Sequence, residues 1–93
     1  MRTIVIQIGN SDDKLTQRMW SSFVADVDAV VQASAAAIHF FGAPPNYTEW
    51  QNVAWIFVIE ERSVEQLKRE VACIRQNFLQ DSVAWLEGEA VFI

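Results

Sequence analysis

The chain contains one histidine and one cysteine, so the side chains most often used as catalytic bases and nucleophiles are scarce. His39 lies beside two phenylalanines in an apolar stretch. An imidazole held in an enclosed cavity could act as an acid, a base or a pH switch. No Asp, Glu or Ser stands at a spacing that identifies a partner for it. His39 is the sole candidate for a catalytic residue, and a strand histidine satisfied by one hydrogen bond is the favoured interpretation.

Cys73 is the only cysteine, which excludes an internal disulfide and a zinc site built from cysteines. A single thiol is typical of a protein from a reducing compartment. Helical periodicity places Cys73 on the outer face of its helix, and no basic side chain is positioned to activate the thiol. We therefore expect a surface cysteine without a chemical role, with a place in a protein contact as the alternative.

Asp12 and Asp13 follow Gly9 and Asn10 where a strand meets the start of a helix. A helix N-terminus attracts anions, but two carboxylates at this point would repel a phosphate, and the chain has no P-loop or glycine-rich fingerprint. Helix capping is favoured over a cation held by the two aspartates. No cofactor and no metal site is expected, and the sequence favours a protein without enzymatic activity.

The formal charge of −5 and the pI near 4.6 argue against direct binding of nucleic acid. Phosphate contacts need clustered Lys and Arg, whereas the seven in this chain are spread from Arg2 to Arg75. No segment approaches the ~20 apolar residues of a membrane helix, and the first residues are too short an apolar run for a signal peptide. We expect a small, soluble, cytoplasmic protein with no membrane partner.

Alternating and helical hydrophobic patterns define the expected elements. β-branched residues mark the strands, Gly42 and Pro44 begin a loop, and Ser63 with Gln66 matches a capping box. In chain order we expect a strand at Thr3–Ile8, a helix from about Asp12 to Ala33, strands at Ala35–Phe41 and Val53–Ile59, a helix from Ser63 to before Asp81, a strand at Ser82–Leu86 and a short final strand at Ala90–Ile93.

This β-α-β-β-α-β order is that of the ferredoxin-like fold, an α+β sandwich. It predicts a single domain over residues 1–93, with a four-stranded antiparallel sheet, two helices on one face and a short C-terminal strand extension. Thr3–Ile8 and Val53–Ile59 would be the central strands.

Val53–Ile59 is apolar on both faces, although the helices of this fold cover only one face of the sheet. Whichever face is open, large apolar groups would meet water in a monomer, and a patch of this kind usually marks a contact site. It could be covered by a second copy, by a different protein, or by the chain's own loop and last strand. The expected contact residues, including two aromatic residues of the loop, are Trp55, Phe57, Ile38, Phe40, Tyr47 and Trp50.

The leading hypothesis is a small non-enzymatic protein-interaction module that forms a homodimer through the open apolar sheet face and binds or regulates another protein. The first alternative is a ligand-binding protein or small enzyme of the dimeric α+β-barrel type that uses His39. The second is an acidic inhibitor of a nucleic-acid-handling protein, which would require the carboxylates to gather on one face.

Overall fold

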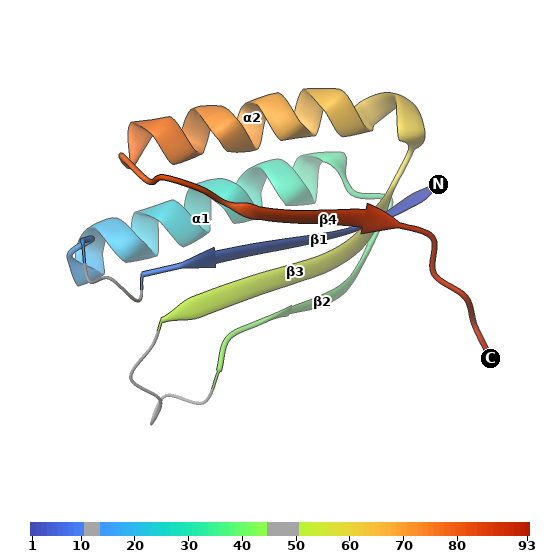
Figure 1. Cartoon of the computed structure of the whole chain (residues 1–93), viewed down its shortest axis with the longest axis horizontal. Coiled ribbons are helices and arrows are strands. Elements are labelled where there is room, and N and C mark those ends of the chain that lie inside the picture. Colours follow the sequence, from blue (N-terminus) through green and yellow to red (C-terminus); the bar gives the residue numbers. More distant parts are fainter. Residues whose placement is uncertain (11–13, 45–50) are drawn as a thin grey trace.

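A computed structural model describes residues 1–10, 14–44 and 51–93. Both helices lie on one side of a four-stranded antiparallel sheet with the strand order β2-β3-β1-β4 (Figure 1). The elements are β1 (Arg2–Gly9), α1 (Gln17–Ser34), β2 (Ala37–Gly42), β3 (Asn52–Ile59), the short 3₁₀ helix η1 (Glu61–Ser63), α2 (Val64–Asn77) and β4 (Ala84–Gly88). The expected order of the elements as far as β4 and the two central strands are confirmed.

The end of the chain differs from the sequence-based expectation. β4 continues beyond Leu86, the expected end of the strand, through Glu87 and Gly88, which pair with Ile4 and Thr3 of β1. Residues 89–93 then have no regular secondary structure, so the final strand is not formed. β1, the antiparallel partner of β4, begins at Arg2. Residues beyond Gly88 therefore have almost no strand left to pair with.

Both helices begin differently from the predictions. α1 begins at Gln17, because Thr16 is its N-cap and accepts a hydrogen bond from the Met19 amide at 3.2 Å; the proposed capping residues 11–13 lie outside the described residues. Ser63 precedes α2 but makes no capping bond. It already has a helix-like backbone as the last residue of η1, whereas a capping residue needs an extended one.

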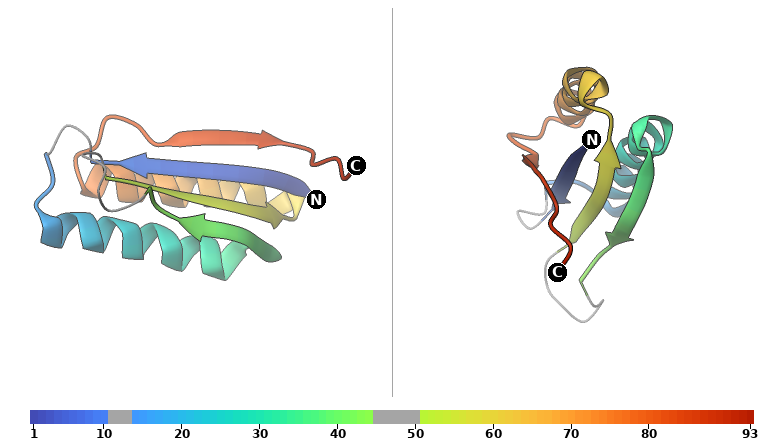
Figure 2. Two further views of the ribbon diagram at one scale, coloured as in Figure 1. Left: turned by 90° about the horizontal axis from the view of Figure 1, so that it is seen from below. Right: turned by 90° about the vertical axis from the view of Figure 1, so that its right-hand side faces the viewer.

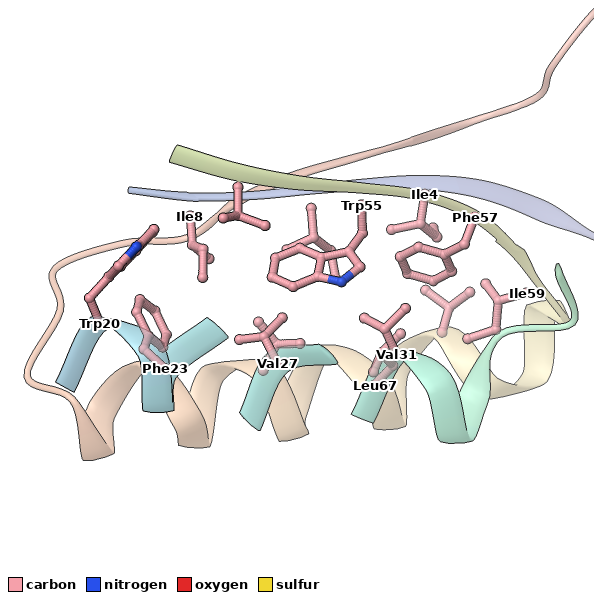
Figure 3. Close-up of a cluster of buried hydrophobic side chains, with 14 of the residues drawn as sticks. Ile4, Ile8, Trp20, Phe23, Val27, Val31, Trp55, Phe57, Ile59 and Leu67 are labelled. Atoms are coloured by element: carbon pink, nitrogen blue, oxygen red, sulfur yellow. The ribbon is translucent and has the colours of Figure 1, made fainter. Parts of the chain in front are cut away.

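One hydrophobic core fills the space between the sheet and the helices (Figure 3). Ile4, Ile6 and Ile8 of β1 are at most 2% exposed. Each helix contributes about one buried residue per turn, as the 3.6-residue period requires. The buried helix residues are Trp20, Phe23, Val27, Val31, Val64, Leu67 and Val71.

Candidate interaction surface

β3 sends its larger side chains to the helices. Trp55 and Phe57 are fully buried in the core, as the sticks in Figure 3 show, and Ile38 pairs with Phe57 and packs against the same core. This corrects the expectation that Trp55, Phe57 and Ile38 contact a partner. Successive strand residues point to opposite faces, so the register that buries the tryptophan presents Ala54, Ile56 and Val58 on the other side.

In the described part of the chain, no helix covers the other side of the sheet (Figure 2). Strand pairing arranges its side chains in three rows that cross all four strands in the order β4, β1, β3, β2. These rows, which we call the open face, are Gly88–Thr3–Val58–Ala37, Leu86–Val5–Ile56–Phe40 and Ala84–Gln7–Ala54–Gly42. None of these residues is charged, and only Thr3 and Gln7 are polar. The middle row is apolar from edge to edge.

The two ends of the middle row are the most exposed. Leu86 on β4 is 67% exposed and Phe40 on β2 is 49% exposed. The Phe40 ring lies over Gly42, since a Cβ atom at Gly42 would be 2.7 Å from its Cζ atom. Phe40, predicted from the sequence as a contact residue, therefore presents its ring on the open face.

The remaining sequence candidates lie elsewhere. His39 is exposed at the register shift between Ile38 and Phe40, and it does not line any of the three hollows that border β4. Tyr47 and Trp50 lie outside the described residues. Cys73 is exposed on α2, as its periodicity predicted. Within the described ranges, no group of three or more His, Cys, Asp and Glu side chains is arranged to hold a metal ion.

A charged cluster joins β4 to α2 on the helix-covered side. Glu87 accepts a hydrogen bond from the Lys68 ammonium at 2.8 Å and one from the Trp85 indole at 3.2 Å, and Arg2 is 3.5 Å away. The Lys68 hydrogen bond lowers the pKa of Glu87, and the same bond raises the pKa of Lys68. These contacts pin the edge strand β4 to the layer of helices.

Three hollows formed by the described residues border β4. One, of about 330 Å³, lies beside Gln7 and Ala84 and has a mostly polar lining. The other two lie on opposite sides of the strand. The larger, of about 560 Å³, lies between α2 and β4 and includes Arg75 and Asp81. Its charged groups are engaged within the chain, because Arg75 donates to the Gln80 carbonyl at 2.9 Å and Asp81 pairs with Lys14 at 3.3 Å.

The smaller hollow, of about 290 Å³, lies at the end of the open face where β4 finishes. Its lining is mostly apolar surface from Thr3, Val5, Leu86, Gly88 and Ala90, and Glu87 and Glu89 also contribute to it. A Cβ atom built at Gly88 would meet no other atom within 4 Å. We call this space the Gly88 hollow.

Solved structures with the same arrangement identify the fold. A dimeric ferredoxin-like protein of unknown function from Thermobifida fusca superposes with a TM-score of 0.64 at 9% identity, covering 97% of this chain and 92% of that one. The fold is ferredoxin-like. The C-terminal domain of MgtC from Mycobacterium tuberculosis gives a TM-score of 0.63 at 13% identity, covering 96% and 89%. A hypothetical Arabidopsis thaliana protein gives 0.61 at 12%, covering 98% and 89%.

Other comparisons add no family to this ferredoxin-like fold. No protein-family model matches the chain, and no match was found among curated proteins. In the part of the chain that the structure describes, neither helix has the length and apolar character required to cross a bilayer.

Proposed function

We propose that this protein is a non-enzymatic, homodimeric interaction module whose two copies pair through the open faces of their sheets. The observation that carries the proposal is the uncharged open face with its apolar middle row, Leu86–Val5–Ile56–Phe40. An antiparallel sheet that meets water on one side normally alternates apolar and polar residues. A contiguous apolar patch on a soluble domain is typical of a protein contact.

A second copy is the partner that this surface fits best. The chain carries a formal charge of −5, so two copies repel each other over most of their surfaces. The open face is free of charged side chains, and two such faces meet without that repulsion. A two-fold contact also requires one surface to complement itself, which two apolar sheet faces stacked on each other can do. The related fold from Thermobifida fusca is described as dimeric.

The size of the open face is consistent with a large share of a dimer interface. Four strands about 4.8 Å apart, with an average length of about seven residues at ~3.3 Å each, cover roughly 400 Å². A stable interface of standard size buries about 800 Å² on each partner. The sheet supplies about half of that area, and residues beside it supply the rest.

The proposal includes a further protein that the dimer binds or regulates. Pairing through the open faces leaves the layer of helices of each copy exposed. The outer side of α2 carries both signs of charge, with Glu65, Arg69 and Glu70 among its residues. A mixed, exposed surface of this type suits a reversible polar contact.

The two alternatives gain less support from the structure. The enzyme hypothesis needs His39 inside a cavity, and it is an exposed side chain at an edge-strand irregularity. The inhibitor hypothesis needs carboxylates gathered on one face. Those of the described ranges are spread over α1, η1, α2, β4 and the segments beside them, and several pair with Lys or Arg.

Sedimentation velocity across the micromolar range tests the dimer. The variant Leu86→Glu places a carboxylate in the middle row of each open face, and we expect it to sediment as a monomer while the unchanged protein sediments as a dimer. Leu79→Glu is the matched control, because Leu79 is 83% exposed after α2 and away from the open face. An unchanged protein that is monomeric, or a Leu86→Glu variant that dimerises like the control, would refute the proposal.

A further inference from the structure

Gly88 is a glycine within a strand that needs no glycine for its own conformation. Its φ is not positive, and a Cβ atom there would meet no atom of the chain within 4 Å. A glycine in a strand weakens it and often marks a bulge, a tight bend, or a place where a ligand or another backbone approaches closely. The open space above Gly88 is the Gly88 hollow, whose apolar sides come from Val5 and Leu86.

The segment directly after β4 carries large apolar side chains that are exposed to solvent. Val91 is 82% exposed and Phe92 is 88% exposed, and Figure 1 shows this segment leading away from the sheet. Large exposed apolar side chains next to one another are unfavourable in water, since burial of a phenylalanine is worth about 1.5–3 kcal/mol. The chain thus has an unfilled apolar hollow and an unburied aromatic ring at the same end of β4.

We propose that, in the dimer, Phe92 of each copy inserts into the Gly88 hollow of the other copy. The inference rests on the proposed dimer and adds the contact that completes it. The occupant is a second copy of this chain, with a phenyl ring as the inserted group. An apolar cavity of about 150 Å³ accommodates benzene, so a hollow of about 290 Å³ accommodates a phenyl ring with its neighbours.

The segment is long enough for this exchange. Phe92 is four positions after Gly88, and an extended chain covers about 13 Å over four steps at ~3.3 Å per residue. Stacked sheets lie about 10 Å apart. Ala90 itself lines the hollow, so the hollow and the base of the segment meet at one corner of the open face. A two-fold axis near this corner brings each Phe92 to the partner's hollow.

The exchange also accounts for the missing interface area. The open face covers roughly half of the area that a standard interface buries on each partner. An aromatic side chain buries about 150–250 Å², and Val91 adds to it. In this arrangement Gly88 is the residue that leaves room for the partner, which is the reason a glycine occupies a strand position that any residue could adopt.

The test uses one variant on each side of the contact. Phe92→Ser removes the inserted ring, and Gly88→Val fills the hollow with a strand-favouring side chain that fits the monomer. Because each dimer contains the contact twice, we expect either change to raise the dimer dissociation constant about 100-fold or more. Leu79→Ser is the control for loss of an exposed apolar side chain and leaves the constant unchanged.

Sedimentation equilibrium gives the dissociation constants, and thermal unfolding of each variant confirms that the monomer folds. If Phe92 occupies the hollow, the dissociation constant of the double variant Gly88→Val/Phe92→Ser is no higher than that of the more weakly dimerising single variant, because either single change already removes the contact. If the effects of the two substitutions on the dissociation constant instead add in the double variant, the proposed exchange is refuted.

The remaining outcomes separate this inference from the proposed function. A dimer that Leu86→Glu disrupts but Phe92→Ser and Gly88→Val leave intact refutes the exchange and keeps the proposed function. A lower unfolding temperature of Phe92→Ser with an unchanged dissociation constant means that the ring covers its own chain, which also refutes the exchange. A monomeric unchanged protein refutes both.

Discussion

The indole Nε1 of Trp55, at the centre of β3, donates a hydrogen bond of 2.9 Å to Oδ1 of Asp28 on α1. Trp55 is completely buried, and Asp28 lies at the border of the core. A buried indole needs an acceptor, and α1 provides one only on the helix-covered side. This bond therefore helps to determine which face of β3 is open.

Replacement of Asp28 by alanine leaves the indole N–H without an acceptor. We expect Asp28→Ala to lower the free energy of unfolding by about 1–3 kcal/mol in urea titrations. Asp28→Asn keeps an acceptor oxygen and should lower the free energy of unfolding clearly less than the alanine variant does. Equal stabilities of the alanine variant and the unchanged protein would show that this bond does not stabilise the fold.

Asn10 organises the turn between β1 and α1. Its side chain, in a residue only 3% exposed, accepts from the Leu15 amide at 3.0 Å and donates to the Leu15 carbonyl at 3.0 Å and to Gln51 at 2.9 Å. Asn10→Ala leaves buried backbone groups unpaired, and we expect a loss of about 2–4 kcal/mol in chemical unfolding. The exposed Asn77→Ala is the matched control and should change stability by less than about 0.5 kcal/mol. Similar losses in both variants would contradict this role.

Leu79 ends α2 in a left-handed backbone conformation, with a φ of 55°. The Leu79 amide donates to the Gln76 carbonyl and the Gln80 amide to the Arg75 carbonyl, both at 3.0 Å, as in a Schellman motif. A side chain in this conformation costs about 1–2 kcal/mol relative to glycine. Leu79→Gly should therefore raise the unfolding temperature, since the side chain is 83% exposed and loses little packing. A lower unfolding temperature would mean that Leu79 makes a stabilising contact.

The ion pair between Lys68 and Glu87 should make stability depend on pH. The pKa of Glu87 lies below its ordinary value of 4.5 in the folded state, so its ionised form stabilises the fold at neutral pH. That contribution is lost as the pH falls below 4.5 and through the lower folded pKa. The unchanged protein should thus lose more stability on acidification than Glu87→Gln, which cannot ionise.

Thermal unfolding at neutral and acidic pH measures this difference. Glu89→Gln, which removes an exposed carboxylate two residues further along, is the control and should retain the pH dependence of the unchanged protein. Added salt should reduce the difference, because the pair lies at the surface. An identical pH dependence of Glu87→Gln and the unchanged protein would exclude Glu87 as its source.

Local sequence patterns were sufficient to predict the helices and strands and their order along the chain. The spacing of Val64, Leu67 and Val71 predicted the buried stripe of α2, because helical periodicity is a property of neighbouring residues. The start of α1 was placed too early. Asp12 and Asp13 resemble capping residues, but the hydrogen bonds of Asn10 delay the helix until Thr16. Those bonds join residues whose pairing no local pattern reveals.

The residues of the open face are only partly predictable from the sequence. Phe40, a predicted contact residue, lies on this face, whereas Trp55 lies on the helix-covered side, and Leu86 and Val5 are not among the predicted contact residues. The alternation of side chains between the two faces of β1 and β4 indicates that Val5 and Leu86 lie on the open face, since Val5 follows the core residue Ile4 and Leu86 follows Trp85. The cross-strand row to which they belong depends on register, which is a property of two strands together.

By itself, the sequence determined the α+β element order, the ferredoxin-like topology and an excess of apolar surface, because these depend on composition and local periodicity. Only the tertiary structure decided which side of β3 meets the helices, that Leu86, Val5, Ile56 and Phe40 form one row, and that Gly88 stands beneath an empty hollow. Both faces of β3 are apolar, so the choice between them was made by the packing of Trp55 against α1, a contact between residues 27 positions apart.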